Sequence, residues 1–154
     1  ANLERANLEE ANLERAKLKK ANLKKANLRK ANLNKADFSN ANLEEAQLCR
    51  VCAELKNTNF KNANLKKAGL WGAPLKKLNL SGADMRGAIL NFANLSNANL
   101  KGANLKKANL RKAKLKKTNL RGADLRGANL KETNLDGAIL CKTKMPWGVE
   151  NSGC

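Results

Sequence analysis

The sequence predicts an all-β solenoid in which the chain turns a corner every five residues. Three observations carry this prediction. Pentads of the form A-[N/D]-L-x-x run through residues 1–147, Ala and Leu stand two residues apart in each pentad, and hydrophobic residues make up 42% of the 154-residue chain. Because two inward-facing residues in every five would supply nearly all of that apolar content, the fixed period indicates one repeated structural unit.

The repeat is regular enough to be read position by position. Leu holds the central position in 25 of 29 pentads, Ala holds the position two before it in 24, and Asn or Asp stands between them in 20. Ten pentads fill residues 1–50, two extra residues follow (Val51 and Cys52), and nineteen pentads fill residues 53–147. We expect the two-residue insertion to bulge from a corner, so that the coils stay in phase.

Neither regular secondary structure fits a period of five. In an α-helix, which turns about 100° per residue, successive Leu residues would be spread around the whole cylinder. In a flat strand, an odd repeat would send successive Leu residues to opposite faces. A chain that corners once per pentad points Ala and Leu inward and the residue between them outward. Four corners close a square coil, and such coils stack at the β spacing of roughly 4.8 Å.

The glycines suggest how the corners are made. Seven of the ten glycines occupy the last pentad position, where a corner that needs a positive φ would favour them. The first 68 residues contain no glycine. We therefore expect a different corner geometry in the N-terminal coils, one that tolerates Lys and Glu.

The A-[N/D]-L-x-x pattern resembles the pentapeptide-repeat family, and the resemblance covers residues 1–147. It implies a right-handed quadrilateral β-helix of about seven coils, with four pentapeptides per coil and with Leu and Ala stacked in the interior. Residues 148–154 would then form a C-terminal cap, because the open end of a solenoid exposes its core and backbone edge.

The C-terminal segment is similar to a terminal motif of bacterial members of this family, through Pro146-Trp147-Gly148 and the final N-S-G-C residues. We expect Trp147 to cover the last Leu layer. A disulfide between Cys141 and Cys154 would fold the tail over the open end, and the alternative is that both thiols are reduced.

The charge is large and unevenly placed. Lys and Arg number 31 against 13 Asp and Glu, which gives a net charge of +18. Nine basic residues and no acidic residue lie between positions 101 and 121, about one coil, so they predict a basic collar around all four sides. The collar is a candidate site for a polyanion such as nucleic acid, anionic lipid or polysaccharide. Its members are Lys101, Lys106, Lys107, Arg111, Lys112, Lys114, Lys116, Lys117 and Arg121.

Two considerations weigh against nucleic acid as the partner. The alternative interpretation of the collar is a solvated surface that keeps the rod soluble, and the collar lacks the aromatic residues that usually accompany single-strand binding.

Some pentapeptide-repeat proteins protect type II topoisomerases by imitating DNA, which requires an anionic surface. The net charge of +18 has the opposite sign and disfavours that role.

One surface region departs from the polar pattern. Two aromatic residues and one aliphatic residue take outward or corner positions on one face, next to the insertion. Exposed apolar area of this kind often marks a partner site. The alternative is that the aromatic rings lie flat over the corner and stabilise the bulge. The candidate partner patch comprises Trp71, Ile89, Phe92, Cys49, Val51 and Cys52.

The sequence offers no catalytic, cofactor or metal site. The chain has no His, and no nucleophile has a base beside it. Cys49 and Cys52 form a C-x-x-C pair, but a redox site of that type needs a βαβ context, and a zinc site needs a second pair nearby. These two cysteines are expected to form a local disulfide or to remain free thiols.

We therefore expect a non-enzymatic scaffold that binds a protein partner or associates with itself. Because the sequence starts within a repeat, we expect either a leader or an upstream domain ahead of Ala1, or a first coil that meets another molecule. In the second case the hypothesis is a dimer or end-to-end association of copies through that coil. An even number of cysteines favours an oxidising compartment, periplasmic or extracellular rather than cytoplasmic. No membrane-spanning segment is evident in the sequence.

Overall fold

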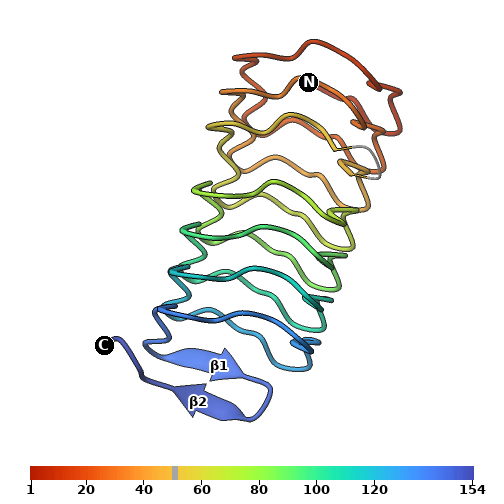
Figure 1. Ribbon diagram of the computed structural model, residues 1–154. Coiled ribbons are helices and arrows are strands. Elements are labelled where there is room, and N and C mark those ends of the chain that lie inside the picture. The colour runs from red at the N-terminus through yellow and green to blue at the C-terminus, as the bar shows by residue number, and fades with distance from the viewer. Residues whose placement is uncertain (50–51) are drawn as a thin grey trace.

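The structure, a computed structural model, describes residues 1–49 and 52–154. The chain winds into a rod of stacked coils, with the N-terminus at one end (Figure 1). The other end carries two short strands, β1 (Thr143–Met145) and β2 (Gly148–Glu150).

Hydrogen bonds between neighbouring coils define the repeat. Parallel bridges join outward residues 20 positions apart, as between Asn2 and Asn22, and 22 positions apart across the insertion, as between Asn42 and Asn64. One coil therefore contains four pentads. Because each pentad contributes only an isolated bridge, the regular strands among the described residues are limited to β1 and β2.

The corners have one geometry along the rod, and the expectation of a separate N-terminal geometry is wrong. The last pentad residue has a positive φ of 52–69° at every corner from Arg5 to Glu45 and from Asn57 to Lys142, whether it is glycine or not. The N–H of the residue after each of these corners donates to the carbonyl oxygen of the preceding central residue, at 3.1 Å from Ala6 to Leu3. A positive φ at this place is typical of a type II turn.

Coil stacking explains why Lys and Glu tolerate this conformation. A left-handed backbone costs a non-glycine residue roughly 1–2 kcal/mol. At most corners the N–H donates to a carbonyl oxygen of the next coil, as from Lys25 to Glu44 at 2.8 Å. The stacking therefore holds the corner backbone in place whatever side chain it carries.

The outward Asn residues fix the corner from the other side. The side-chain oxygen of Asn22 accepts a hydrogen bond from the N–H of Lys24, two residues on, at 3.2 Å. The side-chain nitrogen of Asn42 donates to Asn22 in the neighbouring coil, at 3.2 Å. Asn and Asp favour such local turns, which accounts for their frequency between Ala and Leu.

The interior consists of stacked Ala and Leu, nearly all fully buried in the central coils. Thr118 is also buried, and its hydroxyl donates to the Leu95 carbonyl oxygen at 2.8 Å, so an inward Thr leaves no unpaired polar group. Phe38 and Phe60 stack in adjacent coils with ring centroids 5.4 Å apart. Leu78 is buried as well.

The insertion stays within one corner. Ala53 donates its N–H to the Leu48 carbonyl oxygen at 2.9 Å, so the turn closes after five residues rather than three. A disulfide joins Cys49 and Cys52 across this bulge. Val51 lies outside the described residues. The interior stays in register on both sides of the insertion, since Leu48 and Leu55 are both buried.

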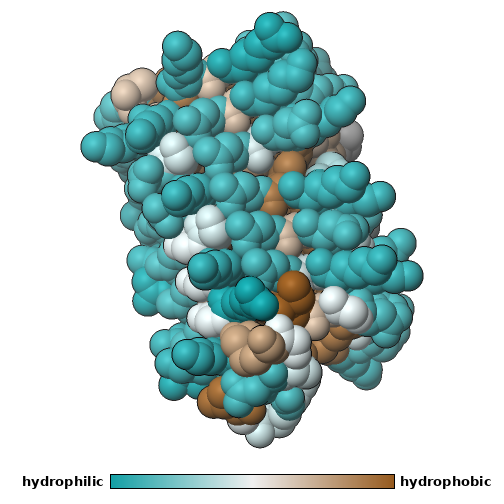
Figure 2. Space-filling view, turned by 90° about the vertical axis from the view of Figure 1, so that its left-hand side faces the viewer, coloured by the Kyte–Doolittle hydropathy of each residue, from teal (hydrophilic) through white to brown (hydrophobic). Residues whose placement is uncertain are grey.

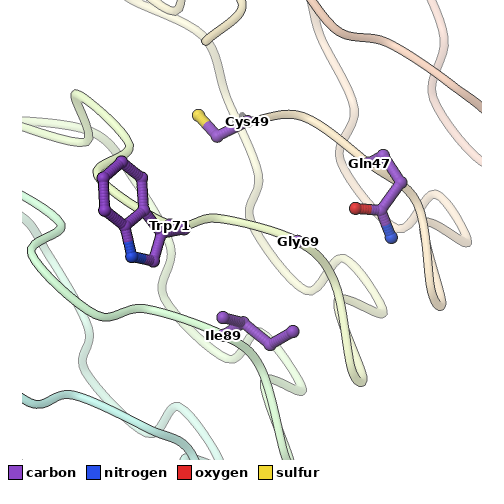
Figure 3. Close-up of a pocket in the computed structure, with 5 residues that line it drawn as sticks. All are labelled: Gln47, Cys49, Gly69, Trp71 and Ile89. Atoms are coloured by element: carbon purple, nitrogen blue, oxygen red, sulfur yellow. The ribbon is translucent and has the colours of Figure 1, made fainter. Parts of the chain in front are cut away.

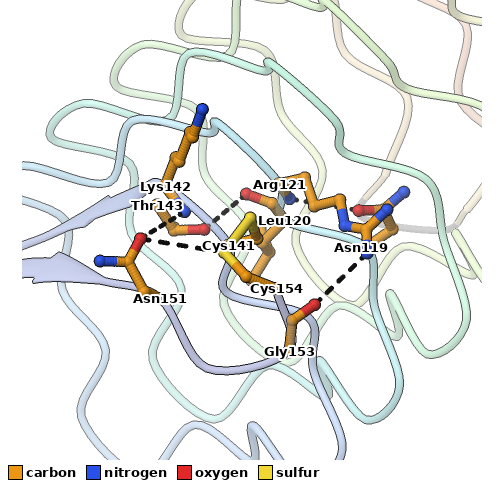
Figure 4. Close-up of a disulfide and its surroundings, with 9 residues drawn as sticks. All are labelled: Asn119, Leu120, Arg121, Cys141, Lys142, Thr143, Asn151, Gly153 and Cys154. Carbon is orange, nitrogen blue, oxygen red and sulfur yellow. Dashed lines mark hydrogen bonds between the residues drawn. A yellow bond between two sulfur atoms is a disulfide. The ribbon is translucent and has the colours of Figure 1, made fainter.

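The C-terminal residues form a hairpin in which β1 and β2 pair antiparallel. A disulfide joins Cys141 to Cys154, and the Lys142 N–H donates to Asn151 (Figure 4). Trp147 is 61% exposed and donates its ring N–H to Glu150. The expectation that Trp147 covers the last Leu layer is therefore wrong, because the hairpin turns the ring toward solvent.

Candidate functional site

The candidate partner patch contains three large apolar side chains that are about half exposed. The exposed fractions are 49% for Trp71, 45% for Ile89 and 47% for Phe92. The rings of Trp71 and Phe92 lie 5.4 Å apart, tilted by 54°. The structure thus brings together three residues separated by up to 21 positions in the sequence.

The bulge lies directly beside this aromatic pair. Cys49 is buried, and the Sγ of Cys52 lies 3.7 Å from the Trp71 carbonyl oxygen. Val51, the remaining residue of the expected patch, lies outside the part of the chain that the structure describes. Trp71 therefore contacts Cys52 through its backbone, while about half of the Trp71 and Phe92 surfaces stays open to solvent.

A depression opens between the patch residues. Its volume is about 430 Å³, and it is lined by Gln47, Cys49, Gly69, Trp71 and Ile89. Figure 3 shows these residues on three successive turns of the chain, with Gly69 between Gln47 and Ile89. A Cβ at position 69 would collide with the side-chain oxygen of Gln47. The absence of a side chain at Gly69 therefore makes room for the Gln47 side chain, which lines the depression.

Sequence reasoning missed Gly69, although a signal was present. It is the one glycine at the outward position of a pentad, where Asn or Asp usually stands. The sequence also gives no sign of the contact between Lys112 and Phe92, in which the ammonium nitrogen lies 5.6 Å from the ring centroid. Such a cation–π contact depends on side chains from two coils and leaves no local signature.

The patch lies within a strongly basic part of the rod. Residues 55–131 contain 18 Lys or Arg and only two acidic residues, Asp84 and Asp124. Both carboxylates are already paired: Asp84 lies 2.6 Å from Arg86, and Asp124 lies 2.7 Å from Arg126. This part of the rod, which contains the depression, therefore carries an excess of positive charge.

The pKa values of these two carboxyl groups reflect their partners. Hydrogen bonds from Arg126 hold the pKa of Asp124 far below its usual range and outweigh the effect of burial. At Asp84 burial raises the pKa, but hydrogen bonds from Arg86 and its charge outweigh that effect and leave the pKa lowered. Both groups are therefore ionised at neutral pH.

The candidate basic collar surrounds the rod close to the patch. Three of its nine residues form ion pairs with acidic residues of the next coil: Lys106 with Asp124, and Arg111 and Lys112 with Glu132, all at 3.4 Å. A guanidinium nitrogen of Arg121 donates to the Gly153 carbonyl oxygen (Figure 4). Within the described residues, no ion pair involves the others, which are Lys101, Lys107, Lys114, Lys116 and Lys117.

The polar character extends over much of the remaining surface. Figure 2 shows a face covered mainly by hydrophilic residues, on which hydrophobic residues gather toward the C-terminal end. No group of acidic or cysteine side chains that could hold a metal ion occurs within residues 1–49 and 52–154. In the same residues, no helix is long and apolar enough to cross a membrane.

The repeat and its geometry agree with known proteins. The family model for pentapeptide repeats matches in eight copies, over residues 1–34, 16–52, 79–116, 88–131 and 108–145. The chain belongs to the pentapeptide-repeat family. Its members are right-handed quadrilateral β-helices and generally act as structural or interaction proteins. No curated protein matches the chain.

Several solved pentapeptide-repeat structures resemble this chain. The crystal structure of HetL, involved in heterocyst differentiation regulation in the cyanobacterium Nostoc sp. strain PCC 7120, is 37% identical, with a TM-score of 0.50 over 96% of this chain and 67% of HetL. A trypsin-treated variant of QnrB1, a plasmid-mediated fluoroquinolone resistance protein, is 19% identical, with a TM-score of 0.49 over 99% of this chain and 85% of QnrB1. Rfr23 from the cyanobacterium Cyanothece 51142 is 34% identical, with a TM-score of 0.29 over 89% of this chain and 82% of Rfr23.

Proposed function

We propose that this pentapeptide-repeat protein is a non-enzymatic interaction scaffold whose partner binds at the candidate partner patch. The observation that carries this proposal is the half-exposed group of Trp71, Ile89 and Phe92 around an open depression. A soluble surface rarely keeps such a group unless a partner covers it. The rest of the rod, about seven coils in residues 1–147 with residues 148–154 as a cap, holds this surface rigid.

The family relationship supports the same function. HetL, which is 37% identical to this chain, is described as a pentapeptide-repeat protein involved in heterocyst differentiation regulation. A regulatory role of that kind rests on contacts with other macromolecules. We do not extend a DNA-imitating role to this chain, because its net charge is +18.

A photoreactive amino acid at position 71 tests the proposal in the organism that makes the protein. The matched control is position 29, because Arg29 holds the same pentad position on the same face, two coils away. We expect position 71 to form a covalent adduct with one protein species and position 29 to form none with it. Equal labelling at both positions, or no protein adduct at position 71, would contradict the proposal.

The basic collar supports a second candidate function, the binding of a polyanion. The supporting observation is that five collar lysines have no acidic partner among the described residues. Heparin and duplex DNA are the probes, in a shift assay with increasing salt. Polyanion binding predicts a steep loss of affinity with salt and no effect of Trp71→Glu beyond that of its added charge.

Self-association is the remaining form of the scaffold hypothesis, in which the partner is a second copy of this chain. Sedimentation velocity over a range of protein concentrations distinguishes it from a different partner. A dimer that Trp71→Glu dissociates would identify the patch as the self-contact. A dimer that survives this substitution would use another surface, such as an end of the rod.

A further inference from the structure

We infer that the partner of the patch is an acidic peptide segment that places one large apolar side chain in the depression beside Trp71. This inference rests on the proposed function and adds the chemistry of the partner. It follows from two independent features of the same surface, the apolar lining of the depression and the sign of the charge around it.

The lining of the depression selects an apolar anchor. Trp71 and Ile89 supply exposed hydrophobic surface, and Cys49 contributes its disulfide-bonded side chain. Between them, the Gln47 side chain lies over Gly69, where a Cβ would otherwise stand. Burial of a large apolar side chain here removes hydrophobic area from water on both partners, which is the usual source of a binding hot spot.

One polar side chain in the depression, that of Gln47, offers a hydrogen-bond acceptor that would orient a bound segment. The side-chain nitrogen of Gln47 donates to the Glu45 carbonyl oxygen at 3.2 Å, and its side-chain oxygen is turned toward Gly69. That oxygen is placed to accept a hydrogen bond from a backbone N–H of a bound segment. A peptide offers such a donor at every residue except proline.

The surrounding charge selects an acidic segment. Lys67 directly precedes the pentad that contains Trp71, and Lys107 and Lys114 flank the pentad that contains Lys112. No ion pair involves these three flanking lysines within the described residues. A partner with carboxylates would complete these pairs, whereas a basic partner would meet uncompensated repulsion.

The acidic residues nearest the patch are not free to bind a basic partner. Glu44 and Glu45 lie 3.7 and 3.6 Å from Lys24 and Lys25 of the adjoining coil. Glu54 accepts a hydrogen bond from Asn34 at 2.7 Å. Together with the pairing of Asp84 and Asp124, these contacts leave the positive groups in excess.

The patch fits a peptide better than a nucleic acid strand. Single-strand sites present open aromatic faces on which bases stack. Here the ring of Phe92 is contacted by Trp71 at 5.4 Å and by the Lys112 ammonium at 5.6 Å. The depression between Trp71 and Ile89 is a site for an aliphatic or aromatic side chain rather than a stacking platform.

Selection from a library of random twelve-residue peptides on phage tests this inference, with the unmodified protein and the Trp71→Glu variant as parallel targets. We expect the peptides enriched only by the unmodified protein to contain one Leu, Ile, Phe or Trp flanked by Asp and Glu. A selected peptide, labelled with fluorescein, then gives the affinity. Trp71→Glu should weaken it at least tenfold, and Lys67→Glu or Lys107→Glu roughly threefold each.

Lys61→Glu is the matched control, because Lys61 lies on another face and forms no ion pair within the described residues. It should leave the affinity within about twofold. Circular dichroism of each variant checks that the fold is retained.

The outcomes separate the inference from the proposed function. Peptides that depend on Trp71 but carry neutral or basic flanks would overturn the acidic partner and leave the scaffold proposal standing. If no peptide depends on Trp71, the inference fails, and a photo-crosslinked protein at position 71 would still support the scaffold. If neither experiment finds a partner at Trp71 and single-stranded DNA binds there instead, both proposals are wrong.

Discussion

The coils of residues 1–49 and those of residues 55–131 share one interior and differ in their surfaces. Leu43 and Leu95 are both fully buried, and the corners of both regions have the same positive φ. Outside, the first region is an orderly array of Asn and paired charges, whereas the second carries seven glycines, an isoleucine and two aromatic residues in outward or corner positions. The repeat therefore determines the interior and corners of the rod, and the residues that depart from the repeat determine how its surface differs from one region to the other.

The charges show the same contrast. In the first region, basic residues face acidic residues one coil away, so the surface largely neutralises itself. In the second, 18 basic residues face two acidic residues. Exposed pairs contribute little to stability, about 0–1 kcal/mol each, so the loss of pairing costs the rod little. The pairs of the first region include Lys24–Glu44, Lys25–Glu45, Arg29–Glu9 and Lys30–Glu10.

The largest expected effect comes from the shared interior. Leu43→Ala and Leu95→Ala should each lower the free energy of unfolding by about 2–5 kcal/mol, because each leaves a cavity in a close-packed stack. The two values should agree within about 1 kcal/mol. Urea unfolding of each variant measures them. A clearly larger loss in one region would show that the interiors are not equivalent.

The disulfides should have the next largest effect. Replacing Cys141 and Cys154 together by Ser should cost roughly 3 kcal/mol, and replacing Cys49 and Cys52 roughly 2 kcal/mol, since the longer loop restricts the unfolded chain more. Thermal unfolding with and without reductant measures both. Equal midpoints in the presence and absence of reductant would mean that neither bridge contributes.

The corners allow a reciprocal test between the two regions. Lys20→Gly should stabilise the protein by up to about 1 kcal/mol, because it relieves a left-handed backbone at φ 59°. Gly102→Lys should cost about the same, although nothing lies within 4 Å of its added Cβ. Denaturant midpoints of the two variants check this. A loss of stability in Lys20→Gly would show that the side chain matters more than the backbone strain.

Acid pH should produce the smallest effect. Because hydrogen bonds from Arg126 lower the pKa of Asp124 in the folded protein, its contribution is complete above the unfolded value of about 4 and is lost as the pH falls below it. The Asp124→Asn variant should therefore lose less stability than the unmodified protein between pH 5 and pH 2. Parallel acid dependence in both proteins would contradict this assignment.

The interior of the rod could be predicted from the sequence, whereas the corner geometry and the position of Trp147 could not. Period-five Ala and Leu dictate a cornering coil, because both residues must be buried and no helix or strand can bury them together. The corners were misjudged because glycine is an unreliable sign of positive φ when coil stacking fixes the backbone, as at Lys20. The exposed Trp147 could not be foreseen, because its position depends on the pairing of β1 with β2.

The candidate partner patch could be predicted from the sequence only in part. Trp71, Ile89 and Phe92 stand out in the sequence because each replaces a polar residue, and column spacing places them on one side of the rod. The depression depends on the Gln47 side chain that lies over Gly69 and on the disulfide-bonded Cys49, and these contacts are tertiary features. Composition alone gave the excess of positive charge but not the pairing of Asp84 and Asp124 that leaves it uncompensated.

The most direct test of the claim that the departures from the repeat form the partner site compares Trp71→Glu with Arg29→Glu. The labelled acidic peptide gives the affinity of each variant, and thermal unfolding gives its stability. We predict at least a tenfold loss of affinity for Trp71→Glu, less than a twofold change for Arg29→Glu, and similar unfolding midpoints for both. Equal losses of affinity in the two variants, or a loss in Trp71→Glu that only follows unfolding, would contradict the claim.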